Sequence, residues 1–472
     1  MIVPITTEPA AHQSAQGGNG NSEPVFDAPT TETQAAVVNY VPKRSSLDSP
    51  TPLLVEDVEP FAPPMPTRLE DLDVNRGFLT ELALKAVALE PDPTTAAVAA
   101  RMHLGIVVVE SLLQRLHREK MIEIKGLVGL HNHRYGVLDR GWTEVNRLMA
   151  LCSYAAAAPV SLRAYTEMLI KQVHARPPVT RQALDKAMAG LVLSDAAKQT
   201  LGLVASSGRS LFLSGPSGNG KSAMARAIVN AIDGDIWIPF AIEVDGQVIR
   251  LFDPHNHQPV TVKCTEYDTR WIKIRPPLVV VGGELTLASM ELSCTDTQRF
   301  YEAPFQLKSN GGVLVVDDFG RQRCSATELM NRWIIPLEQR VDYLTLSTGK
   351  KIEVLFEQII VFATNLTVAD LADEAFLRRM GYRLYVMPPG PDTYAEIFRR
   401  YAHSRGLSVD PDALAHLEIR YGKENRIPKA CEPRDLVDRA VEACKYQRTA
   451  VRLTKEALDV AWDTYFGASA TG

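Results

Sequence analysis

The pattern of apolar and polar positions changes at residue 67. From there apolar residues recur at helical spacing, and the pattern predicts helices over 75–89, 94–102 and 105–120. Two short runs, "MIEIKG" and "HRYGVLD", read as a strand pair, and a further helix begins near "RGWTEVNRLM". Three helices followed by a β-hairpin predict a winged-helix-like module over residues 67–150.

A different sequence pattern begins at residue 185, where short apolar runs alternate with helical patterns. The runs "LFLS" and "VLVV" and the segment "QIIVFATN" have the continuous apolar character of buried parallel strands. In "KSAMARAIVNAI", Met224, Ile228 and Ile232 share one helical face. We therefore predict an α/β fold, an αβα sandwich with a parallel sheet over 185–390, followed by a helical region over 391–472.

Two further hairpins are predicted inside this region. Alternating apolar residues around Asp245-Gly246 indicate a hairpin in an insertion spanning 236–263, to which the sequence gives no role. "VDYLTL" and "KKIEVLF" are expected to pair across Ser347–Gly349.

Two further segments, a tail and a linker, are predicted outside these regions. Residues 1–66 hold eleven of the thirty prolines, with eight acidic and two basic residues, which predicts a disordered acidic tail. Residues 151–184 read as a linker. The six cysteines form no CxxC pair, and the chain start lacks the character of a signal peptide. No run of 18 apolar residues occurs, so we expect a cytoplasmic protein without a membrane span.

The candidate chemistry starts at a glycine-rich loop between a strand and a helix. It matches GxxxxGK[ST], and its residues are Gly215, Pro216, Ser217, Gly218, Asn219, Gly220, Lys221 and Ser222. The glycines let backbone N–H groups turn toward a phosphate. Lys221 suits the β- and γ-phosphates, and the Ser222 hydroxyl suits Mg²⁺. The loop therefore predicts a site for ATP and Mg²⁺.

Polar residues follow the other predicted strands. Asp317 and Asp318 end "VLVVDD"; Asp317 is suited to hold Mg²⁺ and Asp318 to polarise an attacking water. Asn365 ends the next strand and could bond the γ-phosphate or that water. Arg434, in the first turn of a predicted helix opening at "EPRDL", makes an anion site with the helix N-terminus.

Together these segments resemble the AAA+ ATPases. The phosphate loop, "VLVVDD", "ATN", "AFLRRM" and "EPRDL" occur in the order typical of that superfamily, and the hairpin before "ATN" resembles its branch that includes MoxR-type chaperones. The resemblance implies that Asn365 is sensor 1 and that Arg434 is sensor 2 in a C-terminal helical lid. It also implies that Arg379, or else Arg378, is an arginine finger acting on a neighbouring subunit of a homo-oligomeric, hexameric ring.

One position departs from the family pattern, and three others have an open role. Asp318 stands where these ATPases usually carry glutamate, so its reach to the water is one methylene shorter and hydrolysis could be slow. The aromatic residues Phe300, Tyr301 and Phe305 lie where the superfamily places pore loops, although such residues serve equally well in a core.

The function expected from these features is ATP-driven remodelling of a partner protein. Residues 67–150 contain eleven basic and eleven acidic residues, without the basic excess that duplex DNA requires, so protein docking is favoured over nucleic acid. Two alternatives stay open: a DNA-associated motor or loader, and a nucleotide-gated scaffold with little turnover.

Overall fold

The computed structural model describes residues 62–129, 131–262, 266–295, 297–366 and 374–467. Most of the predicted tail, residues 1–61, lies outside the described residues, and so does Cys264.

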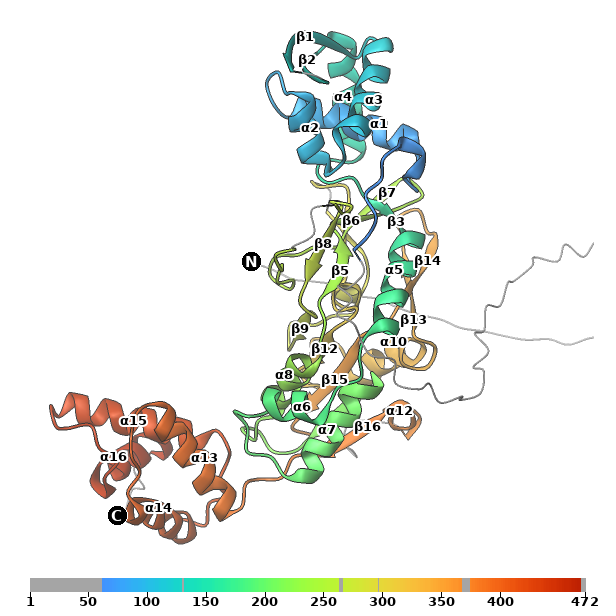
Figure 1. The fold of residues 1–472 in the computed structure, drawn as a ribbon. Helices are drawn as coiled ribbons and strands as arrows, with labels where there is room; N and C mark the ends of the chain where they lie inside the picture. The colour runs from blue at the N-terminus through green and yellow to red at the C-terminus, as the bar shows by residue number, and fades with distance from the viewer. Residues whose placement is uncertain (1–61, 130, 263–265, 296, 367–373, 468–472) are drawn as a thin grey trace, which may run out of the picture. The chain divides into compact units, whose positions relative to one another are not determined.

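The first module has the elements that the sequence predicts, in the predicted order (Figure 1). Its core is apolar and includes Leu79, Leu82 and Leu112, each fully buried. Asn75 and Thr94 cap the first two α-helices by accepting backbone N–H groups. The elements are η1 (Leu69–Asp71), α1 (Arg76–Ala88), α2 (Thr95–Met102), α3 (Ile106–Arg118), β1 (Ile122–Gly129), β2 (Asn132–Val137) and α4 (Asp139–Leu151).

A parallel five-stranded sheet forms the centre of the α/β region, as predicted. Its strands lie in the order β16 (Tyr382–Tyr385), β4 (Leu211–Ser214), β15 (Ile359–Thr364), β12 (Val313–Val316) and β9 (Leu278–Val281). Because side chains alternate along a strand, Val313 and Val315 enter one core and Leu314 and Val316 another. The chain therefore has an α/β fold with helices on both faces of a parallel sheet.

Each face of this sheet is covered by its own helices. The core on one face includes residues of α6 (Arg181–Ala187), α7 (Asp195–Ser207) and α8 (Lys221–Ala231). The core on the other includes Trp333 of α10 (Ala326–Gln339) and Phe376 of α12 (Glu374–Arg379).

A second, mixed sheet is built largely from segments between α8 and β12. Its order is β10 (Ser293–Cys294), β11 (Tyr301–Glu302), β7 (Gln247–Arg250), β6 (Ala241–Val244) and β3 (Val160–Ser161). β6 and β7 form the hairpin predicted at Asp245-Gly246, and both turn residues have positive φ. Nearby lie β5 (Ile236–Pro239), paired with β8 (Trp271–Ile274), and the short helices η2 (Ala288–Met290) and α9 (Phe305–Lys308).

The predicted linker differs from the structure. Residues 151–184 contain β3, which joins the mixed sheet, and α5 (Leu162–Ala175), whose Tyr165, Met168 and Leu169 enter the core beside that sheet. These apolar residues at positions i, i+3 and i+4 are the signal that the linker interpretation missed.

The hairpin expected before Asn365 is confirmed. β13 (Val341–Thr345) pairs antiparallel with β14 (Lys351–Leu355), with Gly349 at positive φ in the connection. The three aromatic residues considered for a pore belong to packed regions: Phe300 and Tyr301 are buried, and Phe305 is partly buried against the α10 core. Tyr301 also binds the hairpin loop, because its hydroxyl accepts the Ser347 N–H at 2.7 Å.

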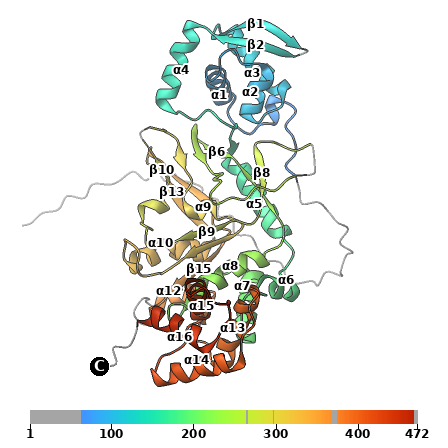
Figure 2. The ribbon, with the colours of Figure 1, turned by 90° about the vertical axis from the view of Figure 1, so that its left-hand side faces the viewer.

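Four C-terminal helices form a bundle (Figure 2). They are α13 (Pro391–Ser404), α14 (Pro411–Lys423), α15 (Glu432–Tyr446) and α16 (Lys455–Phe466). Phe398, Leu436 and Trp462 are among the fully buried residues of their shared core. Among the described residues, no single helix is long and apolar enough to cross a bilayer; α2 and α3 meet that test only as a pair bent by 113°.

Candidate nucleotide-binding site

The glycine-rich loop joins β4, an interior strand of the sheet, to helix α8, as predicted. β4 is buried along its whole length, and the chain turns away from it at Gly215, which has φ +136°. A Cβ at Gly215 would lie 2.3 Å from the carbonyl oxygen of Val386. Only glycine permits this close approach, which brings the loop against the end of the neighbouring strand.

Lys221 begins α8 and folds back into the loop. Its buried Nζ donates to the carbonyl oxygens of Gly215 at 2.8 Å and Pro216 at 2.9 Å. Burial lowers the pKa of Lys221, against the opposing influence of the Asp318 and Asp317 charges. The ammonium group thus lies inside the loop, the position from which it could meet a phosphate.

Asn365 links Lys221 to Asp318. Its Oδ1 accepts a hydrogen bond from Lys221 Nζ at 2.6 Å, and its Nδ2 donates to Asp318 Oδ1 at 3.0 Å. The three residues follow β4, β15 and β12, which are adjacent in the sheet, so their carboxyl ends meet at one edge. Asp318 is exposed and has φ +49°, a left-handed conformation that is uncommon for a residue other than glycine.

Ser222 and Asp317 form the second pair. Ser222 Oγ donates to Asp317 Oδ2 at 2.7 Å. The pair fits Mg²⁺, which takes oxygen ligands and commonly uses only one or two protein groups, with phosphate oxygens and water completing its octahedron. Within the described residues, no group of three or more His, Cys, Asp and Glu side chains could hold a metal ion by itself.

A cavity of about 850 Å³ opens beside the loop. It is lined by Gly218, Asn219 and Gly220, by apolar residues of segments 189–197 and 384–390, and by Arg434. Arg434 lies in the first turn of α15, is largely exposed, and donates from Nε to Asp435 at 2.9 Å. The structure thus brings the predicted second sensor to the same cavity as the phosphate loop.

The two arginine-finger candidates lie elsewhere. Arg379 ends α12 and donates from Nε to Glu338 Oε2 of α10 at 3.1 Å, whereas the side chain of Arg378 is exposed. Neither lines the cavity beside the loop.

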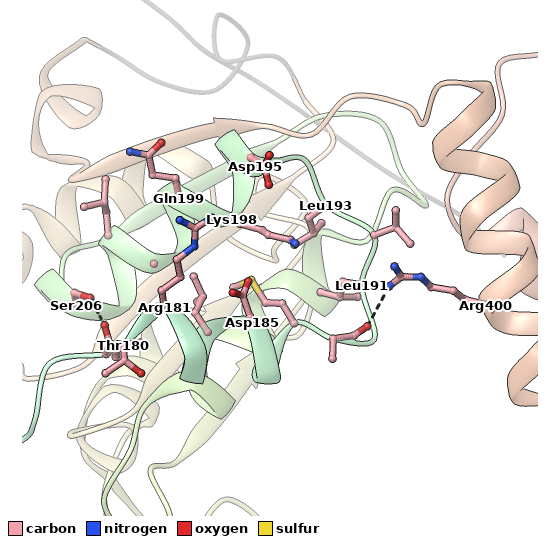
Figure 3. Close-up of a pocket in the computed structure, with 17 residues that line it drawn as sticks. Thr180, Arg181, Asp185, Leu191, Leu193, Asp195, Lys198, Gln199, Ser206 and Arg400 are labelled. Atoms are coloured by element: carbon pink, nitrogen blue, oxygen red, sulfur yellow. Dashed lines mark hydrogen bonds between the residues drawn. The ribbon is translucent and has the colours of Figure 1, made fainter.

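A second cavity of about 760 Å³ lies between α6 and α7, and Figure 3 shows its lining. It adjoins the first, since Ala189, Leu191 and Arg400 are among the residues that line both. Arg400 of α13 reaches its rim and donates to the carbonyl oxygen of Ala189 at 3.3 Å. It contains none of the phosphate-loop residues, so it is distinct from the candidate phosphate site.

Sequence reasoning missed one residue that shapes the site. Gln322 donates from Nε2 to the carbonyl oxygens of Asp317 at 3.0 Å and Asp318 at 3.2 Å, and its Oε1 accepts the Gly320 N–H at 2.7 Å. It fixes the turn that carries both aspartates. No motif signals this role, because the contacts are to backbone atoms.

Comparison with known families matches one segment of the chain. A family model described as a domain of unknown function (DUF8689) matches residues 390–464, the segment of the C-terminal helices. No curated protein matches the chain.

Several solved structures are similar to it at low sequence identity. The RuvB Holliday junction branch migration motor of Thermotoga maritima is 14% identical, with 61% of this chain and 72% of that chain covered and a TM-score of 0.34. NtrX from Brucella abortus in complex with ADP is 17% identical, with 58% and 56% covered and a TM-score of 0.37. A second NtrX structure, in complex with ATP, is 16% identical, with 59% and 62% covered and a TM-score of 0.37. At these TM-scores the similarity carries no weight for function, which we infer from the site itself.

Proposed function

We propose that this chain is an ATPase of the AAA+ type, which binds ATP with Mg²⁺ in the loop 215–222 and hydrolyses it. One observation carries the proposal. Lys221, Asn365 and Asp318 form a continuous hydrogen-bonded chain beside the Ser222–Asp317 pair, at one edge of the parallel sheet. A glycine-rich turn alone would need none of these side chains.

Each residue has a role that its position supports. Lys221 would offer its ammonium group to the β- and γ-phosphates, while Ser222 and Asp317 would hold Mg²⁺. Bound Mg²⁺ neutralises phosphate charge. Asp318 would accept a proton from the attacking water, and Asn365, already bonded to Asp318, would orient that carboxylate.

The second candidate function is a nucleotide-gated scaffold with little ATP turnover, because the Asp318 side chain is one methylene shorter than the glutamate usual at this position. The left-handed backbone at Asp318 and its bond to Asn365 favour hydrolysis, because together they fix the carboxylate at the exposed edge of the site.

The assembly belongs to the proposal as well. A ring, hexameric by resemblance to the superfamily, would bring Arg379 or Arg378 of one subunit to the nucleotide of the next. Arg434 would act within its own subunit, since it lines the same cavity as the phosphate loop.

The winged-helix-like module of residues 67–150 would recognise a protein client. Four of its basic side chains form ion pairs inside the module: Arg101 with Glu90, Arg115 with Glu119, Lys125 with Asp92 and Arg147 with Glu144. Ile106, Val107, Leu127 and Val128 are exposed on α3 and β1. Paired charges and exposed apolar side chains favour a protein partner over duplex DNA.

Phosphate release from ATP tests the catalytic proposal. The wild-type chain should hydrolyse ATP only with Mg²⁺, and Asp317→Asn should lose most of this Mg²⁺-dependent activity. Asp185→Asn, on the exposed side of α6, is the matched control and should keep it. If the wild type shows no Mg²⁺-dependent hydrolysis, the catalytic proposal is rejected and the scaffold with little turnover is favoured.

A further inference from the structure

The crest of the phosphate loop, Gly218 and Asn219, is hydrogen-bonded to the chain segment that leads into α15. The carbonyl oxygen of Gly218 accepts the Cys431 N–H at 2.9 Å. Asn219 Oδ1 accepts the Ala430 N–H at 3.1 Å. Two consecutive loop residues thus hold two consecutive amides of the C-terminal helical bundle.

The contact is closely packed. A Cβ placed on Gly218 would lie 2.7 Å from Cys431 Sγ, so a larger residue there would force a shift at this contact. The segment is also fixed within its own bundle, because Glu432 Oε2 accepts the Lys429 N–H at 2.7 Å and the Tyr421 hydroxyl at 2.6 Å. A displacement of the loop crest is therefore transmitted to a well-anchored part of the bundle.

Asn219 has one hydrogen-bonding group left over. Its residue is 4% exposed, and among the described residues its Nδ2 has no hydrogen-bond partner. Because Asn219 Oδ1 accepts the Ala430 N–H, the side-chain oxygen faces Ala430 and the Nδ2 donor of Asn219 faces away from it. A buried amide donor without an acceptor is unfavourable, and in a loop whose neighbours Gly218 and Gly220 line the cavity it points to a ligand oxygen.

We propose that Asn219 is a positioning residue that couples phosphate binding to the placement of α15. Its Nδ2 donates to a phosphate oxygen of the bound nucleotide, while its Oδ1 keeps the Ala430 amide. Phosphate in the loop then orders the start of α15, the helix whose first turn carries Arg434. This inference rests on the proposed nucleotide site and adds the residue through which the helical bundle responds to it.

Hydrogen exchange of the peptide spanning residues 425–436 tests the coupling, measured with and without saturating ATPγS. In the wild type, the nucleotide should slow exchange of the Ala430 and Cys431 amides. Asn219→Ala should bind nucleotide on the order of tenfold more weakly and show no such slowing even at saturation. Asn219→Asp keeps an acceptor for the Ala430 amide but lacks the donor, so it should match the wild type without nucleotide and gain no protection with it. Its affinity should fall further, because its negative charge faces phosphate.

The control is Thr464→Ala, on the exposed side of α16, where the hydroxyl bonds only to its own helix; it should behave as wild type in both measurements. Full slowing in Asn219→Ala would overturn the coupling, and wild-type affinity in Asn219→Asp would overturn the phosphate contact. If the wild type binds nucleotide but shows no slowing, the inference fails alone. If the wild type binds no nucleotide, the proposed function itself fails. Should Asn219→Ala unfold, Asn219→Asp still decides both points.

Discussion

Lys221 Nζ lies 2.6 Å from Oδ1 of Asn365, a residue 144 positions further along the chain. The contact joins α8, the helix after β4, to the end of the adjacent strand β15. Because Asn365 also holds Asp318, the cation that would meet phosphate and the carboxylate that would meet water are linked through one amide.

Lys221→Ala should reduce ATP affinity by at least tenfold, because it removes the buried cation without altering the apolar face of α8. Titration with a fluorescent ATP analogue measures the change. Lys186→Ala, at an exposed position of α6, is the matched control and should bind as wild type. Equal affinity of Lys221→Ala and wild type would reject the phosphate site.

Asp318→Asn should bind ATP but hydrolyse it roughly 100-fold more slowly or worse, because an amide cannot accept the proton of the attacking water. Asp318→Glu should match or exceed the wild-type rate if aspartate is only a short base. Steady-state phosphate release compares the three forms. Equal and barely detectable rates in all of them would support the scaffold candidate.

Arg379→Ala should bind ATP nearly as well as wild type and turn it over about 10³-fold more slowly, the lower end of the effect known for arginine fingers. Mixing it with Lys221→Ala should restore part of the activity, because an intact arginine can then meet an intact loop at some interfaces. Glu338→Ala separates this role from the local ion pair with Arg379. If Glu338→Ala alone causes the same loss and mixing restores nothing, Arg379 serves its own subunit.

Asp253→Asn should make stability less dependent on acid pH. Burial acts to raise the pKa of Asp253, but hydrogen bonds from Lys308, from the His255 amide and from Asn256 outweigh it and lower the pKa to about 2. A carboxylate with a lowered pKa stabilises the fold above its ordinary value of 3.8 and loses that contribution as pH falls toward about 2.

The measurement is the free energy of unfolding from urea titrations between pH 6 and pH 2. The wild type should exceed Asp253→Asn at pH 6, and the difference should shrink between pH 4 and pH 2. Thr464→Ala, which is exposed on α16 and removes no titratable group, should show a constant difference from wild type. A pH-independent difference for Asp253→Asn would contradict the assignment.

The sequence by itself determined the elements that depend on local pattern. Buried runs such as Val313–Val316 form parallel strands, and the alternation around Asp245-Gly246 forms its hairpin, because side-chain periodicity and turn chemistry act over a few residues. The loop 215–222 could be predicted for the same reason, because the pattern of its glycines and Lys221 lies within eight consecutive residues.

Only the tertiary structure decided what distant segments do together. The parallel order of β4, β15 and β12 brings Lys221, Asn365 and Asp318 to one edge, and no local signal encodes that order. Residues 160–175 lie within the predicted linker but pack as β3 and α5, because the apolar side chains of this segment are buried only by contact with the mixed sheet. Asn219 and Gln322 bond to backbone groups, which every residue carries. Their roles therefore depend on which chain segment the fold brings beside them, and the identity of the residues in that segment gives no signal.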